Sequence, residues 1–332
     1  MTAATAPTLS QADAKANAQH DAKPAHGDAQ PEAKPEAKLS ARDFRFRHRL
    51  RVRWAEVDMQ KIVFNGHYLM YLDTAVADYW RALALPYEAV LQHLHGDLFV
   101  KKATLQYHAS ARYDDAIDVC IKCARIGTSS MLFQCEIFRG DEHLISGELV
   151  YVFADPVSQT SRPVPQVLRD WLQGFEAGQP MVEVKTGSWG ELGDHARALR
   201  TQVFIEEQRI SHEQEWDLAD DTSLHAVAFN RLGLPVATGR LLAQSNAALG
   251  DSHIGVAIIG RLAVDRVLRG NGLGRDVLLA LMQAARLRGD RAVALHAQRS
   301  AEGFYQRLGF VARGEPFIEA DIEHIEMVRD LT

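Results

Sequence analysis

The alternation of hydrophobic and polar residues becomes regular near Phe44 and predicts a strand, a long helix and then several strands. From Phe44 to Trp54 apolar and polar residues alternate, as in a half-buried strand. A helix is expected from about Gly66 to Leu83, with a buried stripe of Leu69, Leu72, Val76, Tyr79 and Leu83, and Pro86 ends it. Further strands are expected at 98–107, 117–126, 130–138 and 143–153, and a short helix at 167–175. One long helix followed by antiparallel strands is an α+β pattern.

The second half of the chain alternates strands and helices after a linker-like stretch at 177–181. After a first strand we expect a helix near 192–207, strands at 225–229, 236–244 and 258–264, a helix at 272–288, a strand at 292–298 and a helix at 301–308. This order is typical of an α/β fold with a mixed sheet and flanking helices. We therefore predict a first domain at 41–176 and a second at 182–332.

The first 40 residues differ in composition from the rest. They contain no aromatic residue, and Pro-Glu-Ala-Lys occurs at 31–34 and again at 35–38. Such a segment cannot bury enough apolar surface to offset the entropy of ordering it. We predict a disordered tail at 1–40.

The bulk composition of the 332 residues is that of an ordinary globular protein, with 47% hydrophobic and 24% charged residues. A net charge of −6 gives no reason to expect a nucleic-acid partner. No apolar run approaches the roughly 20 residues that span a bilayer, and the N-terminus has no apolar core of the signal-peptide kind. We expect a cytoplasmic protein without a membrane segment.

The three cysteines predict neither a disulfide nor a metal site. Cys120-x-x-Cys123 lies in a predicted strand, where residues three apart point to opposite faces. No second cysteine pair completes a zinc site. We expect no metal and no tightly bound cofactor.

A glycine-rich segment, Arg269-Gly270-Asn271-Gly272-Leu273-Gly274, lies between a predicted strand and a predicted helix. Glycines at such a turn let the backbone approach a ligand, and the unpaired N–H groups of the first helical turn attract a pyrophosphate. The glycine spacing is wrong for a dinucleotide fingerprint, and no Gly-Lys-Ser/Thr is present to form a P-loop.

This segment resembles the acyl-CoA loop of the GNAT acetyltransferases, and the resemblance covers about 182–332. Gly303 to Phe310 is similar to the downstream helix of that family, which implies that Tyr305 protonates the leaving CoA thiolate. A core aromatic residue is the alternative for Tyr305. The resemblance implies that acyl-CoA is bound by the end of the preceding strand and by the loop, namely Leu262, Ala263, Val264, Arg269, Gly270, Asn271, Gly272, Leu273 and Gly274.

Within the GNAT family the chain is most similar to the ElaA-like subgroup, on segments 203–208, 215–220 and 295–298 and on His225 and His324. The segments around Arg200 and 215–220 also resemble acyl-homoserine lactone synthases, but the intact 269–274 loop favours an ordinary GNAT domain. An unidentified amine acceptor is implied. Four acids could attract a cationic amine or could be solvated charges and caps: Glu206, Glu207, Asp217 and Asp220.

A second candidate site lies where the first long helix is expected to begin. Thioester hydrolysis needs a carboxylate that activates water or attacks directly, and N–H donors that polarise the carbonyl. Asp58 lies in the loop before the helix, and Asn65 lies at the expected helix start. The alternative is that Asp58 is a turn or capping residue.

Residues 44–156 resemble the 4-hydroxybenzoyl-CoA thioesterase family of hotdog proteins, through Glu56, Asp58, Val63, Phe64, Asn65 and Tyr68. The resemblance implies that Asp58 is the catalytic carboxylate and Asn65 the oxyanion donor. Two residues depart from the family pattern: Lys61 replaces a glycine, and His67, a possible substrate-binding residue, replaces an asparagine. Because hotdog sites form between subunits, a homodimer or homotetramer is implied.

Together these features predict a bifunctional acyl-CoA enzyme. The hotdog domain would be an acyl-CoA thioesterase, and the GNAT domain would transfer an acyl group, expected to be acetyl, from CoA to an amine. One alternative is that only one domain is catalytic while the other serves dimerisation or acyl-CoA sensing. Another is a non-enzymatic regulatory protein that binds acyl-CoA.

Overall fold

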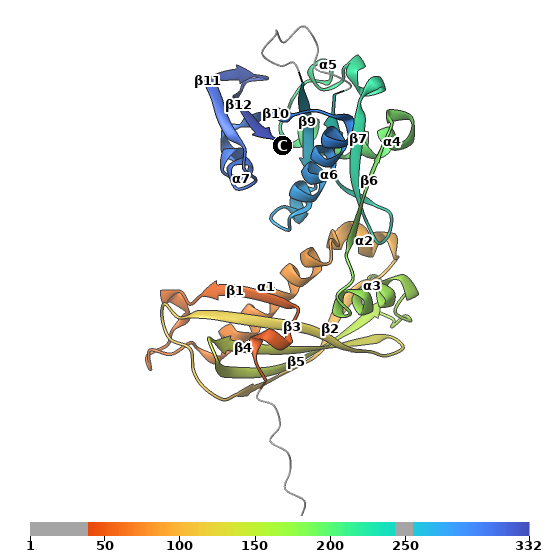
Figure 1. Ribbon diagram of the computed structural model, residues 1–332. Helices are drawn as coiled ribbons and strands as arrows, with labels where there is room; N and C mark the ends of the chain where they lie inside the picture. Colours follow the sequence, from red (N-terminus) through yellow and green to blue (C-terminus); the bar gives the residue numbers. More distant parts are fainter. Residues whose placement is uncertain (1–38, 243–254, 332) are drawn as a thin grey trace, which may run out of the picture. The chain divides into compact units, whose positions relative to one another are not determined.

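The structure is a computed structural model that describes residues 39–242 and 255–331. Of the predicted tail, residues 1–38 lie outside the described part. In this part of the chain no helix is both long and apolar enough to cross a membrane. The described strands form two sheets, one of five strands and one of seven (Figure 1).

The five-stranded sheet is antiparallel throughout and has the order β1-β3-β4-β5-β2. Its strands are β1 (Phe46–Arg51), β2 (Asp97–Tyr107), β3 (Ala116–Ile126), β4 (Ser130–Arg139) and β5 (Glu142–Ala154). The other elements of this lobe are η1 (Ala41–Asp43), η2 (Trp54–Glu56), α1 (Asn65–Ala82), α2 (Tyr87–His93) and α3 (Gln166–Glu176). The strands β1 and β2 are the two edges of this sheet.

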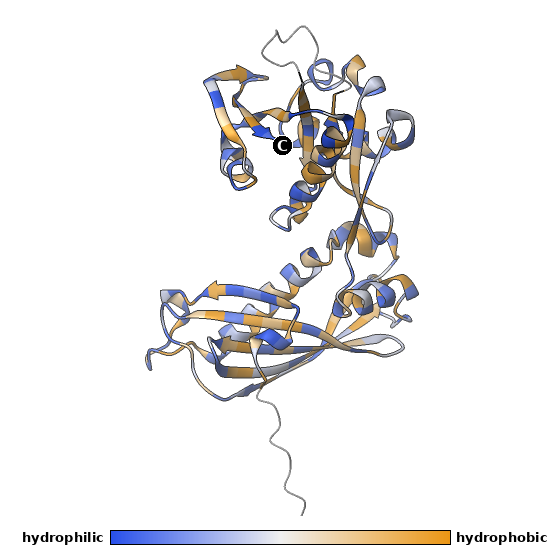
Figure 2. Cartoon of the chain, in the orientation of Figure 1, coloured by the Kyte–Doolittle hydropathy of each residue, from blue (hydrophilic) through white to orange (hydrophobic). Residues whose placement is uncertain are grey.

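The helix α1 lies against one face of the five-stranded sheet and supplies much of its core (Figure 1). Leu72, Val76 and Tyr79 of the predicted stripe are buried, together with aromatic residues that the stripe did not include. Leu69 was expected on the buried face, but 42% of it is exposed in this chain. The helix α1 accordingly carries both hydrophobic and hydrophilic residues along its length (Figure 2).

The seven-stranded sheet is mixed and has the order β11-β12-β10-β9-β8-β7-β6. Its strands are β6 (Val182–Gly187), β7 (Leu224–Asn230), β8 (Pro235–Leu241), β9 (Val256–Val264), β10 (Ala292–Gln298), β11 (Val311–Glu319) and β12 (Ile322–Asp330). The other elements are α4 (Trp189–Arg200), η3 (Thr201–Glu207), α5 (His212–Glu215), η4 (Leu218–Thr222), η7 (Arg266–Leu268), α6 (Leu273–Arg288), η8 (Arg299–Ala301) and α7 (Glu302–Gln306).

Helices cover both faces of the seven-stranded sheet. Along β7, Ala226 and Ala228 pack in the cluster that contains α6, whereas Val227 and Phe229 pack with α4. Because neighbouring strand residues point to opposite faces, α6 and α4 lie on opposite faces of the sheet.

The parallel pair β9–β10 is joined over only part of its length. Only three residue pairs connect the strands, and the last is Ala294 with Ile258. Residues 259–264 of β9 and 295–298 of β10 continue as strands without pairing to each other. We call these residues the splayed segment. No local pattern of residues indicates this separation.

Several predicted boundaries were wrong. Residues 52 and 53 do not continue β1, and η2 begins at Trp54. The predicted helix at 192–207 begins at Trp189, after a capping box formed by Ser188 and Glu191, and it becomes a π-helix at Thr201. The sequence patterns did not predict the helices α2 and α5 or the strands β11 and β12.

The cysteines behave as expected for residues in a strand. Cys120 packs in a small cluster with Phe44 and Phe138, whereas Cys123 packs against the large core of the same lobe. All three cysteines are free thiols. Burial raises the pKa of the Cys120 and Cys123 thiols to about 12.

Lys61 adopts a backbone conformation that favours glycine, with φ of 62°. This left-handed conformation costs a non-glycine residue about 1–2 kcal/mol. Glycine loses roughly 0.5–1 kcal/mol more backbone entropy on folding. We therefore expect Lys61→Gly to raise the free energy of unfolding by about 0.5 kcal/mol, measured by urea denaturation.

Lys101→Gly is the matched control, because Lys101 lies within β2 and has no positive φ. It should lower the free energy of unfolding. Equal destabilisation by both substitutions would show that the loop conformation of Lys61 carries no strain.

Candidate active sites

The loop that carries Asp58 is a tight hairpin leading into α1. The Asp58 N–H donates to the Ile62 carbonyl at 2.9 Å, and the Lys61 N–H donates to the Asp58 carbonyl at 2.9 Å. The Asp58 carboxylate accepts the Gln60 N–H through Oδ1 at 2.8 Å. Asp58 is half-buried, and no hydrogen bond is made to its second oxygen by the described residues. Asp58 is therefore a turn residue that keeps one carboxylate oxygen available.

Glu56 anchors this hairpin to α1. Its side chain is only 3% exposed and accepts hydrogen bonds from the Tyr71 hydroxyl at 2.7 Å and from the Arg53 N–H at 2.7 Å. Burial alone would raise the pKa of Glu56, but these donors and the Arg53 guanidinium together hold it below its ordinary value. Glu56, the first carboxylate of the thioesterase-family motif, thus holds in place the hairpin that carries the second carboxylate, Asp58.

The helix α1 begins without a side-chain cap. Phe64 is its N-cap residue and supplies no capping hydrogen bond, and Asn65 is exposed in this chain. The His67 N–H bonds to the Phe64 carbonyl. The Nδ1 atom of His67 is buried and has no hydrogen-bond partner. The first turn of α1 therefore presents uncommitted polar groups beside the Asp58 hairpin.

Large apolar side chains surround this hairpin on the protein surface. Met59 is 99% exposed and Trp54 is 74% exposed. Phe64, Met70, Tyr107 and Tyr113 are also exposed. These side chains form an exposed apolar surface beside the Asp58 hairpin.

The glycine-rich loop lies where sequence reasoning placed it, between β9 and α6. Gly270 has φ of 89° and Gly272 has φ of 84°, so both adopt the left-handed conformation. Arg269 forms a two-pronged ion pair with Glu207, with both N–O distances 2.7 Å. Hydrogen bonding from Arg269 lowers the pKa of Glu207.

The helix α6 also begins without a side-chain cap, because its N-cap residue is Gly272. The Asp276 N–H donates to the Gly272 carbonyl at 3.0 Å. The N–H groups of Leu273, Gly274 and Arg275 precede this bond and are free of the helical ladder. A Cβ on Gly274 would lie 3.2 Å from the Val264 side chain, so glycine lets α6 begin close against β9.

The predicted strand residues of the acyl-CoA site lie in the splayed segment of β9. Ala263 is buried and pairs with Thr238 of β8, whereas Leu262 and Val264 are half-buried. Arg261 has φ of 53° beside a register shift between β8 and β9. A β-bulge at Arg261 therefore interrupts the strand at this point.

Tyr305 lies in α7 and is 9% exposed. Its ring contacts those of Phe304 and Phe310, with centroid distances of 4.9 Å and 5.8 Å. Burial raises the pKa of Tyr305 to about 12, so the phenol keeps its proton at neutral pH. Tyr305 is thus both a core aromatic residue and a protonated phenol.

Three arginines and three carboxylates form a buried ion-pair network on the face of the sheet that α4 covers. Arg200 bonds to Glu215 and Asp220, Arg240 bonds to Asp217 and Asp220, and Arg261 bonds to Glu215 and Asp217. Arg200 is 1% exposed, and its guanidinium lies 4.6 Å from the centroid of the Trp216 ring. Burial raises the pKa of Glu215 despite its arginine partners.

This network shows how the predicted acids are paired. Asp220 is 3% exposed, Asp217 caps η4, and arginines match the charge of both. Glu207 is likewise paired, with Arg269. These three carboxylates are therefore paired with arginines in the described structure, and a role in binding an amine stays a prediction for them. Arg240 and Arg261 carried no recognisable signal in the sequence.

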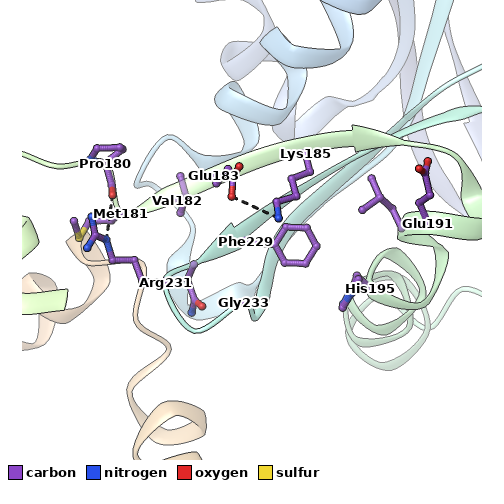
Figure 3. A pocket seen from close by; sticks show the side chains of 12 residues that line it. Pro180, Met181, Val182, Glu183, Lys185, Glu191, His195, Phe229, Arg231 and Gly233 are labelled. Atoms are coloured by element: carbon purple, nitrogen blue, oxygen red, sulfur yellow. Dashed lines mark hydrogen bonds and ion pairs between the residues drawn. The ribbon is translucent and has the colours of Figure 1, made fainter. Parts of the chain in front are cut away.

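A separate surface pocket of the same lobe is lined by β6, α4 and β7 (Figure 3). Lys185 pairs with Glu183 at 3.6 Å and also lies over the Phe229 ring. His195 meets the same ring edge-on. None of the predicted site residues lines this pocket.

Comparison with known proteins assigns both halves of the chain. Residues 60–146 match the thioesterase superfamily, and residues 207–331 match the acetyltransferase (GNAT) domain. The first match includes Asn65 but not Asp58, and the second includes the glycine-rich loop and Tyr305.

Individual relatives cover one half each. Protein ElaA of Escherichia coli is 31% identical over 134 residues, which are 40% of this chain and 84% of ElaA. A crystallised acyl-CoA N-acyltransferase from Pseudomonas aeruginosa is 34% identical, with 45% of this chain and 99% of that chain covered and a TM-score of 0.39. A crystallised 1,4-dihydroxy-2-naphthoyl-CoA thioesterase from Synechocystis is 16% identical, with 39% and 95% covered and a TM-score of 0.36.

The fold and these matches define a two-domain acyl-CoA protein with a thioesterase-superfamily hotdog domain and a GNAT domain. Through its C-terminal half the chain belongs to the GNAT acetyltransferase family.

The ion-pair network generates a prediction about stability. Asp220→Asn leaves two buried guanidinium groups without their shared counter-charge, which costs about 3–5 kcal/mol. Asp221→Asn is the matched control, because the neighbouring Asp221 is exposed and should change stability by less than about 0.5 kcal/mol. Thermal unfolding of the two variants checks this, and similar melting temperatures would contradict a structural role for the network.

Proposed function

We propose that this protein is a bifunctional acyl-CoA enzyme, with thioester hydrolysis in the domain at 41–176 and acyl transfer to an amine in the domain at 182–332. The observation that carries the proposal is common to both domains. Each has a loop of unusual backbone conformation that ends at a long helix without a side-chain cap. Such a helix start binds negative charge, whether it is a developing oxyanion or a pyrophosphate.

In the hotdog domain, Asp58 would act as general base or nucleophile. Its second carboxylate oxygen is available, and the hairpin fixes its position through the Gln60 N–H and the Glu56 brace. The N–H of Asn65 at the start of α1 would stabilise the oxyanion that forms on the thioester carbonyl. Lys61 and His67 lie in the same segment and would influence which acyl-CoA is accepted.

In the GNAT domain, the N–H groups at the start of α6 would bind the pyrophosphate of acyl-CoA. The splayed segment of β9 and β10 offers unpaired strand edges to the pantetheine arm. Tyr305 would donate its proton to the departing thiolate, and its raised pKa keeps that proton available across the assay range. No further cofactor is needed for either reaction; acyl-CoA, expected to be acetyl-CoA in the transfer, is the substrate.

Reciprocal variants test this division of labour. Asp58→Asn should lower thiol release from acyl-CoA without an amine by about 100-fold or more, since it removes the base. Tyr305→Phe should leave hydrolysis unchanged and lower amine acylation by about 100-fold, since it removes the proton donor. Free thiol and acylated amine are measured separately for both variants.

If both activities fall together in either variant, the two sites do not divide the chemistry as proposed. If one activity is absent from the wild type while acyl-CoA still binds, only one domain is catalytic. Tight binding without turnover in either domain would instead indicate a regulatory acyl-CoA-binding protein.

We also propose that the hotdog domain assembles as a homodimer or homotetramer. The exposed apolar residues around the Asp58 hairpin and the long edge strand β2 are surfaces that a second copy would cover. Met70→Glu should shift sedimentation toward a single chain, because it places a charge on this surface. Val157→Glu, at a 93% exposed position elsewhere in the lobe, is the control and should not. A monomeric wild type would contradict the assembly.

A further inference from the structure

The surface pocket beside β6, α4 and β7 shares no residue with either candidate active site (Figure 3). Its volume is about 850 Å³, which lies within the range of pockets that hold small molecules. Three side chains that can donate hydrogen bonds line it: Lys185 of β6, His195 of α4 and Arg231 of the turn between β7 and β8. The pocket is therefore assembled from three separate segments of the chain.

One side of this pocket is apolar. Phe229 of β7 is 9% exposed and Leu192 of α4 is 7% exposed, and both pack in one small cluster on the face of the sheet that α4 covers. Glu183 is the partner of Phe229 in the register of β6 and β7, and Lys185 lies on the same face because it is two residues further along the strand. The His195 ring meets the Phe229 ring edge-on, with the centroids 4.9 Å apart. Polar groups thus surround an aromatic ring.

The two carboxylates that line the pocket already have partners. Glu191 closes the capping box of α4, where it accepts hydrogen bonds from the N–H and the hydroxyl of Ser188, both at 2.8 Å. These hydrogen bonds lower the pKa of Glu191, so its negative charge is held at the start of the helix. Glu183 forms an ion pair with Lys185 at 3.6 Å. Neither acid is therefore free to attract a cationic ligand.

Two of the donors, in contrast, are free or easily exchanged. The side chains of Lys185 and Glu183 are 55% and 74% exposed, and an ion pair so open to water is weak. Lys185 can therefore exchange Glu183 for the carboxylate of a ligand at little cost. His195 is exposed, and within the described chain its ring contacts Phe229 while its nitrogens have no hydrogen-bond partner.

The third donor, Arg231, is fixed in position. Its Nε atom donates to the Pro180 carbonyl at 3.4 Å, and its Nη2 atom donates to the side chain of Gln179. The guanidinium keeps its positive charge at any pH of interest. Arg231 therefore adds a fixed positive charge at the edge of the pocket.

We infer that this pocket binds a small carboxylic acid with an apolar body. The carboxylate accepts charge-assisted hydrogen bonds from Lys185 and His195, and Arg231 adds to the attraction. The apolar body lies along Phe229 and Leu192, where it is removed from water. The site is separate from both proposed reactions, and no step of either reaction involves it.

The charges also decide which ligands are rejected. The ammonium group of an amine with the same apolar body would meet Lys185 and Arg231, and like charges repel. A neutral amide of the same shape would lose the charge-assisted part of the hydrogen bonds, which is about half of their strength. The carboxylate is therefore the form that the pocket selects.

Calorimetric titration of the full chain tests this inference. Benzoate and hexanoate are compared with benzylamine, benzamide and hexanamide, and we expect binding of the two carboxylates alone. Lys185→Gln should weaken benzoate binding about 10-fold, since it removes a charged donor. Glu183→Gln should tighten it, since it frees Lys185 from its competing partner. Opposite effects at two neighbouring exposed positions would not arise from general damage to the fold.

Lys122→Gln is the matched control, because Lys122 is an exposed lysine of β3 in the other lobe. It makes the same change of charge and should leave the affinity for benzoate unaltered. Benzoate that binds equally well to the wild type, Lys185→Gln and Glu183→Gln lies elsewhere on the chain and overturns the inference. Binding of benzylamine as tight as that of benzoate, or no binding of either carboxylate at millimolar concentration, also overturns it. Neither result bears on the proposed reactions, which are measured by thiol release and amine acylation.

Discussion

Both domains are organised around a helix that starts without a side-chain cap. The first N–H groups of any helix lack partners within it, and most helices satisfy them with a nearby Ser, Thr, Asp or Asn. Here Phe64 precedes α1 and Gly272 precedes α6, and neither supplies such an acceptor. Each helix therefore keeps donors for an external anion. The surrounding structure holds the preceding loop in place so that these donors stay accessible.

Different interactions hold the two loops. In the hotdog domain one buried carboxylate, Glu56, ties the hairpin to Tyr71 of α1. In the GNAT domain the buried ion-pair network holds Arg261 at the β-bulge, and Arg269 is clamped by Glu207. Loss of the Glu56–Tyr71 hydrogen bond or of the Arg269–Glu207 ion pair would free a charged side chain near the start of α1 or α6. Polar side chains that are buried or half-buried thus hold both loops.

The regions that sequence reasoning missed are those where local signals are weak. The hairpin β11–β12 turns through Ala320 and Asp321, both with positive φ, although such turns usually contain glycine. Neither an alternating pattern nor a glycine in the turn predicted this hairpin. The hairpin brings Glu319 next to His296. The helix α2 follows Pro86 directly, where the expected helix had just ended. The sequence pattern predicted a regular helix at 192–207, whereas the structure has the wider turns of a π-helix from Thr201 onward.

The sequence by itself determined the order of most strands and helices, the glycine-rich loop and the placement of Asp58 in a loop before α1, because each rests on residues close together in the chain. Only the tertiary structure decided what the charged residues do. Arg200, Arg240 and Arg261 meet Glu215, Asp217 and Asp220 across separate elements and form ion pairs with them. The splaying of β9 from β10 is likewise a property of the sheet. Neither could be read locally, since Coulomb energy and strand pairing depend on distances in space, which the chain sets only when it folds.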